Sequence, residues 1–145
     1  MNLPLPVEEV FGFFADAGNL DKITPAELGF RILTSSPTIG EGSRINYRIR
    51  LCGVSFKWKT MITAWEPPHR FVDLQLRGPY KEWIHTHRFE PTAEGTLIGD
   101  DVRYRLPLSP LGEVAQPLVR RQLERIFTYR HEAIRRMLVP GTEPS

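Results

Sequence analysis

The spacing of apolar residues predicts a short amphipathic helix near the start of the chain. Apolar residues within 7–14 recur at helical intervals, and Pro6 suits the first helical position because a helix needs no N–H there. A break at 16–19 ends this helix. Residues 20–27 indicate one more helical turn, and from Gly29 the period changes to two.

Period-two alternation predicts an antiparallel sheet over the middle of the chain. In 44–51, isoleucine, tyrosine and leucine alternate with arginine and asparagine, so one face of this strand is wet. A tight turn at Cys52 and Gly53 leads to the facing strand, which ends at the turn 66–69. Because short turns join the strands, neighbouring strands are antiparallel. The further strands cover 70–76, 82–90 and 96–106.

A helical period returns in 111–138 and predicts a long amphipathic helix. Pro117 lies inside it and should kink the helix or mark its true beginning. The tail 140–145 is polar and contains Pro and Gly, so we expect it to be flexible. The order of helix, strands and long helix predicts an α+β fold of one domain over 1–139. In this fold a curved antiparallel sheet wraps around the C-terminal helix.

The composition is that of one ordinary globular domain. Hydrophobic residues make up 41% and charged residues 25% of the 145 residues, which argues against long disorder. Cys52 is the only cysteine, so no internal disulfide can form and a thiolate zinc site is disfavoured. No apolar run approaches the ~18 residues of a membrane span, and no basic segment followed by an apolar signal region opens the chain. We therefore expect a cytoplasmic protein without a transmembrane segment.

The charge pattern argues against a nucleic-acid partner. The formal net charge is only +2. Glu113, Glu124 and Glu132 interrupt the arginines of the predicted C-terminal helix, and no aromatic stacking platform accompanies them. Basic residues on the outer face of a helix are usually solvated, so we expect no nucleic acid to bind. The arginines are Arg120, Arg121, Arg125, Arg130, Arg135 and Arg136.

Polarity predicts which face of the last two strands points inward. The aromatic-rich set with Trp83, His85 and His87 is the expected inner face of the first of them. Pairing it with the last strand through the turn 91–95 places His85 beside Asp100, and pairing it with the preceding strand places Asp73 beside His85. A buried group of Asp73, His85 and Asp100 follows, in which the carboxylates would favour a protonated imidazole.

This polar group has three interpretations. Its members can satisfy one another's hydrogen bonds, orient the polar head of a ligand, or transfer protons in a reaction. His85-X-His87 is also a metal-binding spacing, but two imidazoles are not a site without a third ligand of known position, so we expect no metal and no cofactor. The sequence has no nucleophile elbow, phosphate loop, dinucleotide-binding fingerprint or H-E-x-x-H motif. No catalytic residue is therefore assigned.

Aromatic residues on the expected inward faces indicate a cavity. A curved sheet closed by a single helix leaves a space wider than one layer of side chains, and aromatic walls suit a flat or apolar guest. Polar positions among them fit a cavity better than a dry core. The candidate ligand-binding residues are Tyr47, Trp58, Thr60, Phe71, Asp73, Gln75, Trp83, His85, His87, Asp100, Tyr104, Phe127 and Arg130.

Several motifs, in an order that covers nearly the whole chain, carry a family resemblance. They are Leu-Pro-Leu-Pro-Val-Glu-Glu-Val-Phe at 3–11, Trp-Glu-Pro-Pro-His-Arg-Phe at 65–71, Gly-Pro-Tyr at 78–80, Trp-Ile-His-Thr-His-Arg-Phe at 83–89, and Gly-Thr at 95–96 followed by Asp100, Val102 and Tyr104. The chain resembles the START-related (SRPBCC) superfamily of helix-grip domains, which includes polyketide cyclase/dehydrase-like and coenzyme Q-binding START-type proteins.

The resemblance implies a deep cavity between the sheet and the C-terminal helix for lipids, quinones, polyketides or other apolar molecules. Some relatives catalyse cyclisation or dehydration, but their catalytic sites are not uniform, so no catalytic residue carries over. Members normally begin with a full strand, whereas only 1–5 precede the first helix here. We therefore expect the first strand to be short or absent. The open sheet edge would then favour a homodimer.

These observations predict a binding module for a small hydrophobic ligand. The alternative is a cyclase- or dehydratase-type enzyme in which His85 transfers protons and Asp73 or Asp100 orients it. A second alternative is a protein-interaction module with a filled core.

Overall fold

Seven strands form one antiparallel sheet in the order β1-β7-β6-β5-β4-β3-β2. The computed structural model describes residues 1–34, 39–51 and 53–141. The strands are β1 (Asn2–Leu3), β2 (Arg31–Ile32), β3 (Arg44–Leu51), β4 (Val54–Glu66), β5 (Arg70–Arg77), β6 (Glu82–Thr92) and β7 (Gly95–Arg105). The helices are α1 (Val7–Ala15) and α2 (Leu111–Leu138), and three short 3-10 turns, η1 (Ala17–Asn19), η2 (Asp21–Ile23) and η3 (Ala26–Leu28), follow α1.

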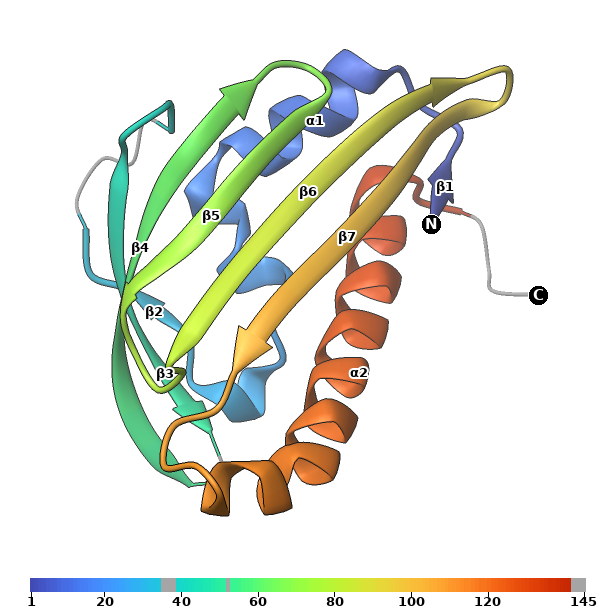
Figure 1. Ribbon diagram of the computed structural model, residues 1–145. Helices are drawn as coiled ribbons and strands as arrows, with labels where there is room; N and C mark the ends of the chain where they lie inside the picture. The colour runs from blue at the N-terminus through green and yellow to red at the C-terminus, as the bar shows by residue number, and fades with distance from the viewer. Residues whose placement is uncertain (35–38, 52, 142–145) are drawn as a thin grey trace.

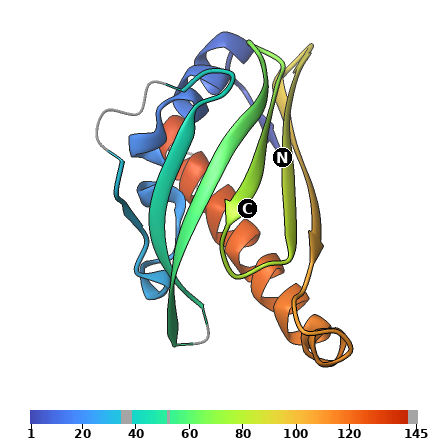
Figure 2. The same cartoon turned by 60° about the vertical axis from the view of Figure 1, so that its left-hand side comes forward.

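The sheet is curved, and the long helix α2 lies along its concave side (Figure 1). The view in Figure 2 shows that α1 and the 3-10 turns lie on the same side of the sheet as α2. The predicted α+β fold, with a curved antiparallel sheet and a long C-terminal helix, is therefore confirmed. Cys52 and the segment 142–145, for which we expected a turn and a flexible tail, lie outside the described residues.

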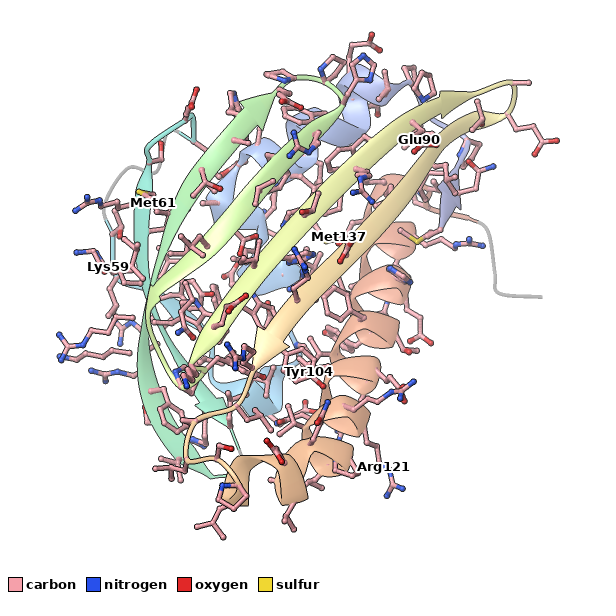
Figure 3. The ribbon with its side chains drawn as sticks, in the orientation of Figure 1. Lys59, Met61, Glu90, Tyr104, Arg121 and Met137 are labelled. Atoms are coloured by element: carbon pink, nitrogen blue, oxygen red, sulfur yellow. The ribbon has the colours of Figure 1, made fainter. Side chains whose placement is uncertain are left out.

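The alternation of polarity orients each strand as expected. On β6, Trp83, His85 and His87 are buried while Arg88 is exposed. Lys59 on β4 points away from the concave side (Figure 3). The outer face of the sheet, on which it lies, is rich in polar side chains. This arrangement places the aromatic and histidine side chains of the sheet beneath α2.

The hydrophobic core is divided into two clusters of buried side chains. The first lies around α1 and the second beneath the first half of α2. Members of both clusters line the candidate site. The first cluster contains Leu3, Val7, Val10, Phe11, Ile23, Ile62, Phe71, Phe89, Ile98, Ala133 and Ile134. The second contains Leu28, Ile49, Trp58, Tyr80 and Trp83.

The two ends of α2 differ in burial. Near its end, Ala133 and Ile134 are buried, whereas Leu111 and Val114 near its start are 71% and 80% exposed. The helix begins at Leu111 and continues through Pro117, so Pro117 does not mark its beginning. Figure 1 shows the first turns at an angle to the rest of the helix, as expected of a proline that cannot complete the hydrogen-bond ladder.

The pairing of β6 with β7 differs from our expectation by two residues. His85 lies opposite Val102 and His87 opposite Asp100, whereas we expected His85 opposite Asp100. The reason is that the turn between the two strands is tighter than the expected turn at 91–95, since Thr92 and Gly95 pair with each other. The predicted pairing of Asp73 with His85 is confirmed.

The first strand is short, as expected. Asn2 and Leu3 pair with Leu97 and Thr96 at the start of β7. Among the described residues no strand pairs with the outer edge of the second half of β7. No helix in the described part of the chain is long and apolar enough to cross a membrane.

Candidate functional site

A cavity of about 150 Å³ lies between the sheet and α2. A space of this size between apolar side chains can hold a molecule about as large as benzene. Most of its wall is aromatic or aliphatic, and three of the polar exceptions, Asp73, His85 and His87, lie side by side on β5 and β6. The candidate residues on this wall are Tyr47, Trp58, Thr60, Phe71, Asp73, Trp83, His85, His87, Phe127 and Arg130.

Three candidate residues lie outside the cavity wall. The Gln75 side chain donates to Tyr80 O at 2.8 Å and accepts from Tyr80 N at 3.2 Å, so it holds the turn after β5. Tyr104 packs with its ring centroid 5.8 Å from that of Tyr80. Asp100 lies behind the histidines, where its Oδ1 accepts from His85.

The wall also contains residues that we did not predict. Tyr80 belongs to the Gly-Pro-Tyr motif, so its position in the sequence carried a signal. Leu123 and Ile126 share the helical face of Phe127 and Arg130, and this spacing could have identified them. In the segment from η1 to β2 the sequence indicated only one helical turn at 20–27, because this segment folds as three short 3-10 turns without a sustained period. It supplies Ala17, Asn19, Leu20, Ile23, Thr24, Leu28 and Phe30.

Two histidines and two aspartates form a compact polar cluster on the concave face, which we call the His–Asp cluster (Asp73, His85, His87 and Asp100). His85 Nε2 lies 2.8 Å from Asp100 Oδ1, and His87 Nε2 lies 2.7 Å from Asp73 Oδ2. The imidazole rings stack with centroids 3.7 Å apart. On its other face the ring of His87 stacks on Phe71 at 4.0 Å. The cluster is thus held between aromatic side chains and opens toward the cavity.

The charges of the cluster follow from burial and from its internal contacts. Burial by itself raises the pKa of Asp73, but the hydrogen bond with His87 and the neighbouring His85 outweigh burial and lower it. Burial likewise opposes ionisation of Asp100, yet His131 and His85 hold its pKa below the usual value. Burial lowers the pKa of His87 to about 4, helped by His85 and opposed by Asp73. At pH 7 the cluster therefore contains two carboxylates and a neutral His87.

Two further polar atoms of the wall lack a hydrogen-bond partner among the described residues. Trp58 Nε1 and Arg130 Nε are buried without a hydrogen bond. The guanidinium of Arg130 lies 5.2 Å from the centroid of the Phe127 ring. Burial raises the pKa of Tyr47 well above the usual value, so its hydroxyl stays neutral. An acceptor on a bound molecule could therefore receive hydrogen bonds from this wall.

A curved sheet that grips a long C-terminal helix, with a cavity between them, defines a helix-grip domain of the START-related class. The chain belongs to the family described as polyketide cyclase/dehydrase and lipid transport, whose model matches residues 1–138. Among curated protein sequences, none matches this chain.

Solved structures share the whole fold at low sequence identity. Protein TTHA0849 from Thermus thermophilus superposes with a TM-score of 0.74 at 19% identity, over 98% of this chain and 96% of that one. Protein Ms6760 from Mycobacterium smegmatis gives 0.69 at 18% identity, over 98% and 89%. Ginseng major latex-like protein 151 from Panax ginseng gives 0.67 at 12% identity, over 97% and 94%. At these identities the likeness concerns the fold alone.

Proposed function

We propose that this protein is a binding module that holds a small hydrophobic molecule in the cavity between the sheet and α2. The observation that carries the proposal is a cavity with mostly apolar and aromatic walls and a polar corner where Asp73, His85 and His87 line it. Burial of apolar surface would supply affinity, and the polar corner would orient the guest. The family description, which names lipid transport, is consistent with this role.

The cavity volume limits the guest. About 150 Å³ accommodates a single aromatic ring or a similarly small group. A lipid, quinone or polyketide is larger than this, so α2 would have to move away from the sheet when such a molecule binds. The residues of α2 on the wall, Leu123, Ile126, Phe127 and Arg130, would move with it. The cytoplasmic location and the absence of a nucleic-acid partner stay predictions from the sequence.

The direct test is native mass spectrometry of freshly purified protein, followed by solvent extraction of any bound molecule. A displaceable apolar dye then measures binding. Thr60→Trp should weaken dye binding at least tenfold, because Thr60 is buried on the wall and the indole fills the cavity. Thr63→Trp, an exposed change on the same strand, should leave it unchanged.

A second filling variant guards against misfolding of the first. Leu123→Trp acts from the opposite wall on a residue that is only partly buried, so the fold should tolerate it better. If neither folded variant loses dye binding, or if the wild type shows no saturable binding, the binding-module proposal is wrong. An interaction module would then be the better account.

The His85–Asp100 contact supports a second candidate function, a cyclase- or dehydratase-type enzyme. A histidine held by a carboxylate and facing a cavity is suited to proton transfer. With an identified substrate, His85→Gln should lower turnover ~10²-fold or more, since it removes the titrating group but retains hydrogen bonding. His69→Gln, at an exposed histidine, is the matched control. Unchanged turnover in His85→Gln would assign His85 to structure.

A further inference from the structure

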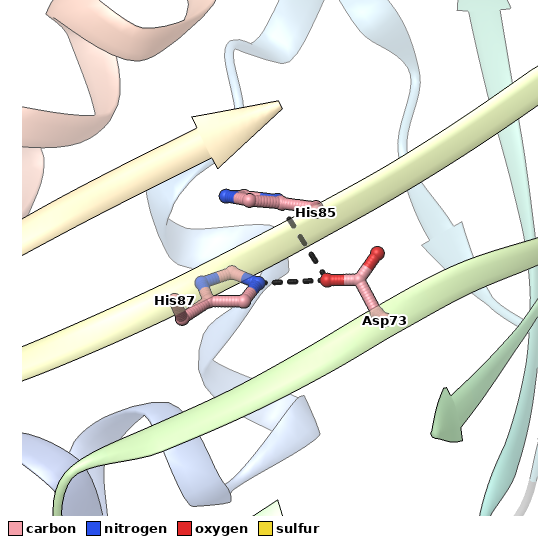
Figure 4. Close-up of side chains that lie close together, drawn as sticks. All are labelled: Asp73, His85 and His87. Atoms are coloured by element: carbon pink, nitrogen blue, oxygen red, sulfur yellow. Dashed lines mark hydrogen bonds and ion pairs between the residues drawn. The ribbon is translucent and has the colours of Figure 1, made fainter. Parts of the chain in front are cut away.

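Three potential metal ligands converge on the cavity wall from two neighbouring strands (Figure 4). Asp73 Oδ2 on β5 lies 2.7 Å from His87 Nε2 and 3.7 Å from His85 Nδ1 on β6. Donor atoms of the three side chains all lie within 4.8 Å of one another. In a tetrahedral zinc site with bonds of about 2.1 Å, ligand atoms are about 3.4 Å apart. Of the two observed distances from Asp73 Oδ2, the one to His87 Nε2 (2.7 Å) is shorter than this value and the one to His85 Nδ1 (3.7 Å) is longer.

The hydrogen bonds of the cluster leave one ring nitrogen of each histidine facing a carboxylate without a hydrogen bond. An ionised carboxylate can only accept a hydrogen bond. His85 Nε2 therefore donates to Asp100 Oδ1, and His87 Nε2 donates to Asp73 Oδ2. The Nδ1 of His85 faces Asp73 Oδ2 at 3.7 Å, and the Nδ1 of His87 faces Asp100 Oδ1 at 3.6 Å. His87 Nδ1 is buried and has no hydrogen-bond partner.

We propose that Asp73, His85 and His87 bind one divalent transition-metal ion, with Asp73 Oδ2, His85 Nδ1 and His87 Nε2 as ligands. The ion would replace the hydrogen bond between His87 Nε2 and Asp73 Oδ2. For His87 to bind through Nε2, its proton moves to Nδ1, which then donates to Asp100 Oδ1. Asp100 would accept from both imidazoles, which is how carboxylates commonly orient metal-binding histidines. The ion thus accounts for the unpaired His87 Nδ1 and for the position of Asp100.

The ligand chemistry selects the class of ion. Two imidazoles and one carboxylate suit zinc, iron(II), cobalt(II) and similar ions, whereas magnesium and calcium prefer oxygen ligands alone. Because all three ligands line the cavity, the remaining coordination positions face it. An oxygen atom of water or of a cavity guest could occupy them. This inference does not depend on the proposed binding function, since the ion can be tested without any guest.

The test uses the wild-type chain, stripped of metal with a chelator and titrated with zinc in a calorimeter and with cobalt(II) in a spectrophotometer. We expect one equivalent of each ion, a visible cobalt absorption band and a higher Tm with zinc. Asp73→Asn and His87→Gln should each weaken zinc binding at least 100-fold. Asp100→Asn should weaken it 10- to 100-fold, because it affects the orientation of the ligands only.

Two substitutions outside the cluster are the controls. His69→Gln and Asp101→Asn change exposed residues of the same types and should bind zinc as the wild type does. Circular dichroism checks that every variant is folded. The proposal is overturned if the wild type takes up no zinc, or if binding survives in folded Asp73→Asn and His87→Gln. In either case a proton on His85 Nδ1, between two carboxylates, would explain the geometry instead.

Discussion

At the scale of single residues, hydrogen bonding separates cavity-lining groups from groups that support the wall. Thr60 lines the cavity while its hydroxyl donates to Leu74 O at 3.1 Å. Gln75, although polar and paired with Thr60 across the sheet, directs both ends of its amide to the backbone of Tyr80. Gly78 leaves room for this contact, since a Cβ there would lie 2.6 Å from Gln75 Oε1. Gln75 therefore shapes the cavity by holding Tyr80 in its wall.

Gln75→Ala should lower the free energy of unfolding by about 1–3 kcal/mol, because it removes two hydrogen bonds from partly buried backbone groups. Dye affinity should change much less than in Thr60→Trp, since Gln75 does not touch the cavity. Urea unfolding and dye titration measure the two effects. Gln116→Ala, on the exposed start of α2, should be within about 0.5 kcal/mol of wild type. A loss of dye binding without a loss of stability would return Gln75 to the binding site.

At the scale of elements, α2 consists of an anchored half and an exposed half. Ile134 near its end is 1% exposed and belongs to the cluster around α1. Leu118 near its start is 61% exposed. The Arg125–Glu27 ion pair connects the middle of the helix with η3, but both side chains are exposed and such a pair stabilises little. The end of α2 around Ile134 therefore holds the helix against the sheet, and the part up to Arg130, which carries the wall residues, can move if a large guest enters.

Two truncations on α2 test this division. Ile134→Ala should lower the free energy of unfolding by about 2–5 kcal/mol, because it leaves a cavity in a closely packed cluster. Leu118→Ala should cost about 0.5 kcal/mol or less, since its side chain is largely in water. Urea unfolding at low protein concentration measures both. Equal losses would mean that Leu118 is covered in solution, for example by a second copy of the chain.

At the scale of the whole molecule, the outer edge of β7 is the place where self-association is expected. Ile98 N donates to Met1 O and Met1 N donates to Ile98 O, so the backbone groups of Ile98 point toward this edge. The backbone groups of alternate residues share this direction, so the backbone groups of Val102 and Tyr104 also point toward this edge. In the described part of the chain no strand meets them. In a twofold antiparallel pair centred on Val102, Asp101 of one copy would face Arg103 of the other.

We predict a homodimer at micromolar concentration, joined through this edge, with sedimentation as the measurement. Val102→Pro should shift the dimer toward monomer, because the substitution removes an N–H that points outward without removing a β6–β7 hydrogen bond. Val102→Ala is the control, since it shortens the same side chain and keeps the N–H. A monomeric wild type, or equal dissociation in both variants, would contradict the prediction.

The sequence by itself determined the elements and the faces of the strands. Helical spacing located α2 at Leu111–Leu138, and alternation placed Trp83, His85 and His87 on the inner face of β6. Both properties are local, because side-chain direction depends on a period of 3.6 or 2.0 residues along one chain segment. The motifs added the family, which the match over residues 1–138 confirmed.

Only the tertiary structure decided which inward residues meet. A shift of two residues between β6 and β7 leaves every side chain on its face, so polarity could not distinguish His85 from His87 as the neighbour of Asp100. Register decides the contact of His87 with Asp73 and the convergence of the three proposed metal ligands. Irregular turns decide the contribution of Leu20 and Thr24 to the cavity. These are set by packing between segments far apart in the sequence, which no local period records.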